Sequence, residues 1–131
     1  MRVAVFIPSD HLGAWSWPDF GLGLVAASGT DAQIIGLSQS LSLRVDVTLL
    51  PIFAGRVPVD PPAESAVAND LAAAAHLAAA WRADVFLFID RQDGSPPDCV
   101  AVCDSHGLRP IAWSQHGTFV PARPLYHHTP P

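Results

Sequence analysis

Short runs of apolar residues, separated by polar loops, recur along the chain. Residues 3–7 (VAVFI) and 84–89 (DVFLFI) are apolar almost throughout, which is typical of strands covered on both faces of a parallel sheet. Three further segments carry weaker strand patterns. The expected strands are residues 3–7, 21–27, 45–50, 84–89 and 109–113.

Helical patterns lie between these strands. Thr30 and Gln33 match the capping-box pattern that opens a helix. An alanine-rich segment has high helix propensity, while Pro96 suits the first position of a helix and Gly107 the residue just after its end. The expected helices are residues 31–43, 64–82 and 96–106.

Strands that alternate with helices predict the fold class, a three-layer Rossmann-like α/β domain with a mostly parallel sheet of about five strands. We expect this domain over residues 1–115, with residues 51–62 as a loop. Residues 116–131 are expected to form a proline-rich C-terminal tail that wraps the surface or stays disordered.

Composition narrows the possible partners and the compartment. The net charge is −5 and the 7 basic residues are all arginines scattered along the chain, so no nucleic-acid partner is expected. No apolar run is long enough for a signal peptide or a membrane span, so we expect a cytoplasmic protein without a membrane partner. Cys99 and Cys103 lie four residues apart, which favours two reduced thiols over a disulfide.

Candidate chemistry gathers in loops that follow the expected strands. In doubly wound folds ligands bind beyond the carboxyl ends of the strands, so the polar segments 8–11, 28–31 and 90–98 should meet at one edge. Segments 28–31 and 90–98 also open helices, whose free N–H groups suit a phosphate. Simple helix capping is the competing interpretation for both.

Individual residues in this region have alternative interpretations. Asp98 fits a general acid/base, a ribose ligand or a capping carboxylate, and Cys99 fits a nucleophile or a core-facing thiol. Cys99, Cys103 and His106 fall roughly on one helical face, but three ligands from one helix rarely converge on a metal, so no metal or cofactor is expected. Trp15 and Trp17 suit either a lid that stacks on a base or a homodimer interface.

Several of these segments resemble the SLOG group of Rossmann-like proteins, and in particular its small YspA-like members. Residues 2–11 are similar to that group's first strand and its Gly-Ser-Arg-Asp ending, and residues 29–32 resemble its Gly-Ala-Asp-Ala helix start. Asn69 stands where YspA-like proteins have an Arg-Asn pair. Gly94, Ser95, Asp98 and residues 107–111 resemble the Gly-Gly-x-Gly-Thr loop, the helix after it and the Gly-x-Pro-Val strand.

The chain also departs from the SLOG pattern. Ala68 replaces the arginine of the Arg-Asn pair, and the glycine-rich loop is shortened. The phosphoribohydrolases of the group carry a catalytic glutamate on the following helix, where this chain has Cys99 with Asp98 beside it. The resemblance therefore implies nucleotide-type binding more than hydrolysis.

These considerations predict a protein that binds a nucleotide or nucleotide derivative as a sensor or binding module. The expected ligand-binding residues are Ser9, Asp10, Ser28, Gly29, Thr30, Asp31, Asn69, Asp90, Gly94 and Ser95. One alternative is an N-glycoside hydrolase or nucleoside transferase, in which Asp98 or Asp93 would replace the missing glutamate as the catalytic carboxylate. Another is a non-catalytic interaction protein that keeps the fold and has lost the ligand.

Overall fold

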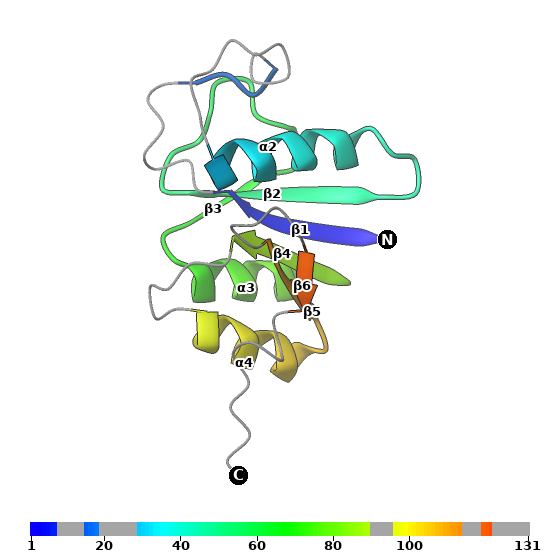
Figure 1. Ribbon diagram of the computed structural model, residues 1–131, viewed down its shortest axis with the longest axis vertical. Helices are drawn as coiled ribbons and strands as arrows, with labels where there is room; N and C mark the ends of the chain where they lie inside the picture. Colours follow the sequence, from blue (N-terminus) through cyan, green and yellow to red (C-terminus); the bar gives the residue numbers. More distant parts are fainter. Residues whose placement is uncertain (8–14, 19–28, 90–95, 114–118, 122–131) are drawn as a thin grey trace.

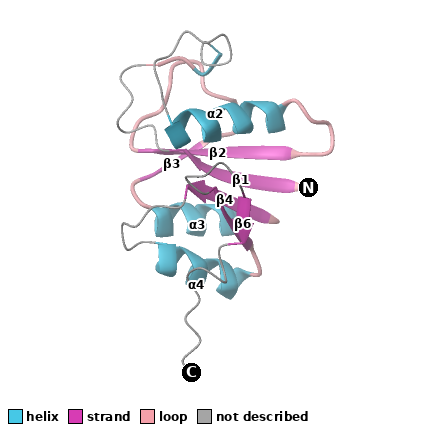
Figure 2. Cartoon of the chain, viewed as in Figure 1, coloured by secondary structure: helices cyan, strands magenta, loops and turns pink. Residues whose placement is uncertain are grey.

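The computed structural model describes residues 1–7, 15–18, 29–89, 96–113 and 119–121. Helices lie on both faces of a β-sheet (Figures 1 and 2). In chain order the elements are β1 (Arg2–Ile7), α2 (Gly29–Ser42), β2 (Thr48–Ala54), β3 (Ala66–Ala68), α3 (Leu71–Ala80), β4 (Val85–Ile89), α4 (Pro96–His106), β5 (Arg109–Trp113) and β6 (Phe119–Pro121). No helix in this described part of the chain is long and apolar enough to cross a membrane.

The sheet has the strand order β3-β2-β1-β4-β5-β6. Its first five strands are parallel, and β6 pairs antiparallel with β5. Helix α2 covers one face, and α3 and α4 lie side by side on the other (Figure 1). The predicted Rossmann-like α/β fold is therefore confirmed.

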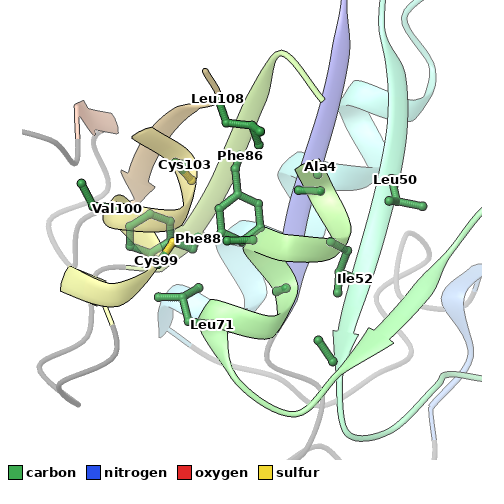
Figure 3. Packing of buried hydrophobic residues seen from close by; sticks show 14 of the residues in the cluster. Ala4, Leu50, Ile52, Leu71, Phe86, Phe88, Cys99, Val100, Cys103 and Leu108 are labelled. Atoms are coloured by element: carbon green, nitrogen blue, oxygen red, sulfur yellow. The ribbon is translucent and has the colours of Figure 1, made fainter. Parts of the chain in front are cut away.

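Alternation along the central strands divides the core into two halves. Phe86 and Phe88 of β4 point toward α3 and α4, where Figure 3 shows them with Leu71 and Cys99. Their rings stack with centroids 5.9 Å apart. This half closes tightly because α3 contributes small alanine side chains to it, which allow the neighbouring helix to approach.

The other half of the core lies between the sheet and α2. Val5 and Leu87 from the two central strands pack there with Ile34 and Ile35 of α2. Both central strands are thus buried on both faces, as their continuous apolar runs predict.

Several sequence-based predictions agree with the observed elements. The strands expected at residues 3–7, 84–89 and 109–113 correspond to β1, β4 and β5, and two of the three expected helices correspond to α2 and α4. The strand expected at residues 21–27 lies outside the described residues. The predicted capping box is not observed, because Thr30 lies inside α2 and the Oε1 atom of Gln33 accepts a 2.6 Å hydrogen bond from the indole N–H of Trp113.

The strand predicted at residues 45–50 was placed too early. Strand β2 spans residues 48–54, so the first four residues of the expected loop, beginning with Pro51, are buried strand, whereas Val45 is fully exposed. Pro51 reads as a strand breaker in sequence because it has no N–H. It is accommodated because β3 pairs only with residues 52–54, which leaves β2 with a single partner strand, β1, at Pro51.

The helix predicted over residues 64–82 is also too long. Residues 66–68 of this segment form β3, and α3 begins only at Leu71. Asp70 stops the helix from extending backwards, because it has an extended φ of −145° and its Oδ1 accepts a 2.7 Å hydrogen bond from the N–H of Ala73. Asn69 therefore lies before the helix and not inside it.

The described part of the tail predicted over residues 116–131 is a short strand. Residues 119–121 form β6, which pairs with residues 111–113 of β5. The last ten residues, 122–131, lie outside the described part of the chain.

Helices α3 and α4 end in the same backbone motif with different residues. Arg82 follows α3 with a φ of 64°, and Gly107 follows α4 with a φ of 72°. In both, the N–H of the next residue donates to the carbonyl five positions back, at 3.0 Å after Arg82 and 2.9 Å after Gly107. This is a Schellman motif, in which the left-handed position costs little for glycine and about 1–2 kcal/mol for a residue with a Cβ atom.

We expect Arg82→Gly to increase the free energy of unfolding by about 0.5–1 kcal/mol, because relief of the strained φ exceeds the entropy lost by a glycine. Gly107→Ala should decrease it by about 1 kcal/mol, and this effect is purely conformational because a Cβ atom there meets nothing within 4 Å. Urea unfolding of the two variants measures both changes. A loss of stability in Arg82→Gly would mean that the arginine side chain contributes more than its backbone strain costs.

Candidate binding site at the carboxyl edge of the sheet

The ends of the five parallel strands define one edge of the sheet, which we call the carboxyl edge. At its centre β1 and β4 are neighbours, paired from Val3↔Val85 to Val5↔Leu87. The chain nevertheless continues from β1 to α2 on one face and from β4 to α4 on the other (Figure 1). In doubly wound sheets this reversal of strand order opens a crevice between the diverging connections, and ligands bind there.

Two helices begin at the carboxyl edge beside this reversal. A helix that connects parallel strands starts near the end of the strand before it, and the first turns of α2 and α4 both lie at this edge (Figure 1). The sequence predicted that segments 8–11, 28–31 and 90–98 would meet at one edge. Residues 29–31 and 96–98 both lie at this edge, on opposite faces of the sheet, and the rest of these segments is outside the described residues. Helix N-termini carry partial positive charge and free N–H groups, which suit an anionic ligand.

The two helix starts are unequal as phosphate sites. Helix α4 begins with Pro96 and Pro97, neither of which has a backbone N–H. Two of the four N–H groups that a helix normally leaves free at its start are therefore missing. Helix α2 begins with Gly29, Thr30 and Asp31, which all retain their N–H groups. The start of α2 is consequently the better anion site.

The residues predicted from sequence are distributed unevenly over the described structure. Gly29, Thr30 and Asp31 form the first turn of α2, and Asp98 is the third residue of α4. Seven others lie outside the described residues: Ser9, Asp10, Ser28, Asp90, Asp93, Gly94 and Ser95.

Asn69 also lies at the carboxyl edge, although not where the sequence suggested. It follows the last residue of β3 and directly precedes Asp70, the N-cap of α3, and its side chain is exposed. Strands β2 and β1 separate β3 from β4, so Asn69 lies to one side of the reversal of strand order between β1 and β4. A ligand that reaches it must extend along the edge of the sheet.

The two cysteines are core residues. Cys99 and Cys103 are free thiols with 0% of their surface exposed, and they pack with the alanines of α3. The hydrogen bond with Cys103, together with burial, raises the pKa of Cys99 far above its usual range. A protonated, enclosed thiol is not a nucleophile, so that interpretation of Cys99 is not supported. His106 is exposed, and no group of three or more metal-ligating side chains occurs within the described ranges.

Trp15 and Trp17 pack against the sheet. Trp15 is 4% exposed, and its ring makes an edge-to-face contact with Phe53 at a centroid distance of 6.1 Å. Trp17 is half-buried and contacts Phe53 in the same way at 5.8 Å. Val59 holds the segment through two backbone hydrogen bonds of 2.7 and 3.0 Å. Because Trp15 is buried, it is a core residue. The prediction that it stacks on a base or forms a homodimer interface had assumed an exposed side chain.

The end of β2 contains a feature that sequence analysis missed. Arg56 follows Gly55 immediately after β2, and its side chain is exposed at the carboxyl edge. Sequence analysis did not single out Arg56 because residues 51–62 were expected to form a loop. Arg56 was therefore expected in the middle of that loop and not at the end of a strand. Only the pairing of β2 with β1 and β3 reveals it.

Comparisons with known proteins add no functional information. No family model, curated protein or solved structure matches this chain. The functional proposal therefore rests on the fold and on the residues at its carboxyl edge.

Proposed function

We propose that this protein binds a nucleotide or nucleotide derivative at the carboxyl edge, between the ends of β1 and β4. The observation that carries the proposal is the strand order β3-β2-β1-β4-β5, which puts a reversal of strand order beside the start of α2. The resemblance of several segments to the SLOG group supports the same ligand class. A sensor or binding module needs only this binding site and no catalytic residue.

The proposed ligand contacts follow from these elements. The N–H groups of Gly29, Thr30 and Asp31 at the start of α2 bind the phosphate. Asn69 binds a more distant part of the ligand. The remaining proposed contacts are Ser9, Asp10, Ser28, Asp90, Gly94 and Ser95.

The hydrolase alternative is less well supported. The position that resembles the catalytic glutamate of the SLOG phosphoribohydrolases is Cys99, whose side chain lies in the core between α4 and α3. A carboxylate at that position would not reach a ligand. Catalysis would then depend on Asp98 or Asp93.

A thermal-shift series of adenosine, AMP and ADP tests the proposal. We expect AMP or ADP to raise Tm more than adenosine does, because the phosphate makes the contact with α2. A ligand at 100 times its Kd adds about 2.7 kcal/mol of stability, or about 8–15 °C for a chain of this size. Guanosine, cytidine and uridine nucleotides extend the series. Absence of a shift with any nucleotide would contradict the proposal.

The variant Gly29→Pro locates the phosphate contact. Proline is tolerated in the first turn of a helix but removes one N–H donor, whereas the control Gly29→Ala keeps that donor. We expect the shift with AMP to shrink in Gly29→Pro and to persist in Gly29→Ala. Equal shifts in the two variants would place the phosphate elsewhere.

A further inference from the structure

The chain leaves β2 through a tight turn that fixes the position of Arg56. The N–H of Arg56 donates to the carbonyl of Ala54 at 2.8 Å, which closes a three-residue γ-turn around Gly55. Gly55 has a φ of 75°, a conformation that glycine adopts readily, and its own N–H donates to the carbonyl of Ala68 at 3.2 Å. Arg56 is therefore anchored to the strand end and not carried on a loose loop.

The register of the sheet sets where this arginine lies. Strand β2 is the neighbour of β1, and Ile7, the last residue of β1, is paired with Phe53. Arg56 comes three residues after Phe53, so it lies beyond the end of β1, at the carboxyl edge of the sheet. Its side chain is exposed at the edge where the proposed nucleotide binds.

In dinucleotide-binding sheets with this strand order, a side chain near the end of the second strand reaches the ribose. An acidic residue there binds the ribose hydroxyls, whereas an arginine accommodates a phosphate on the ring. Here the first acidic residue after β2 is Asp60, four positions beyond Arg56. The planar guanidinium is well suited to a phosphate, which it can bind through two parallel hydrogen bonds.

We propose that Arg56 binds a phosphate monoester on the ribose ring, so that the ligand is a 2′- or 3′-phosphorylated nucleotide. This inference rests on the proposed nucleotide function and narrows its ligand class. Arg56 also has an interaction within the fold, and its guanidinium carries five N–H donors in all.

Two nucleotides that differ by one phosphate give the test. Titration calorimetry of the full chain compares AMP with adenosine 2′,5′-bisphosphate, and adenosine 3′,5′-bisphosphate identifies the ring position. We expect one of the bisphosphates to bind about 10–100-fold more tightly than AMP, the range for a charge-assisted contact. Arg56→Gln should abolish this preference, so that AMP and the bisphosphates bind with similar affinity.

The control variant is Arg109→Gln, which removes an exposed arginine from the start of β5, at the opposite edge of the sheet. It changes the net charge equally and should retain the preference. Equal affinities for AMP and both bisphosphates in the unmodified protein would overturn the role of Arg56 while leaving the nucleotide function intact. Absence of binding by all three nucleotides would overturn both proposals.

Discussion

Replacing Phe53 with alanine is expected to lower the free energy of unfolding by about 3–5 kcal/mol, the range for truncation of a buried aromatic side chain. Phe53 is 0% exposed in the half of the core that α2 covers. Its ring also makes edge-to-face contacts with the rings of Trp15 and Trp17. The cavity cannot close easily, because backbone hydrogen bonds to Val59 hold the tryptophan segment in place.

Urea unfolding followed by circular dichroism measures this loss. The control is Leu43→Ala, which truncates an apolar side chain that is 84% exposed and should change stability by less than about 0.5 kcal/mol. A cost below about 1 kcal/mol for Phe53→Ala would contradict the assignment of residues 51–54 to a buried strand. The tryptophan fluorescence of the folded variant gives a second readout, because Phe53 packs against two indole rings.

Stability is expected to fall at alkaline pH because of Cys99. The hydrogen bond with Cys103 and burial raise the pKa of the folded thiol, whereas the unfolded thiol ionises near pH 8.5. Below that pH the thiol is protonated in both states, so the stabilisation is fully present. Above it only the unfolded state loses the proton, and the free energy of unfolding falls by about 1.4 kcal/mol per pH unit.

Denaturation curves between pH 7 and 10.5 measure this effect, which amounts to about 2–3 kcal/mol over the range. The matched variant Cys99→Val has a side chain of similar size and no ionisable group, so its stability should depend less on pH. The difference between the two proteins isolates Cys99 from the other groups that titrate in this range. Parallel curves for the two proteins would contradict the enclosed, protonated thiol.

Two parts of the carboxyl edge, the start of α4 and Arg56, could be predicted from the sequence to different degrees. The helix start at Pro96 is readable because proline at that position has a direct steric cause, and the same two prolines reveal that α4 offers few N–H donors. The position of Arg56 at the carboxyl edge could not be predicted from the sequence, because it depends on where β2 ends. Pro51 argues against a strand in that segment. A charge becomes a candidate ligand contact only when the strand that carries it is known.

The sequence by itself determined the elements whose signals are local or continuous. The apolar runs of β1 and β4 require burial on both faces, and Gly107 ends α4 through its own backbone freedom. Together they were enough to predict the Rossmann-like class.

Only the tertiary structure decided where β2 and β3 lie, which residues pack in the half of the core that α2 covers, and which residues lie at the carboxyl edge. Local propensity argues against a strand at Pro51 and at Ala66–Ala68. Each is nevertheless part of a strand, because it pairs with a strand that is distant in sequence. Trp15 is core because Phe53 and Val59 lie beside it, and neither is near it in the chain. Strand pairing and burial are non-local, so local propensity cannot specify them.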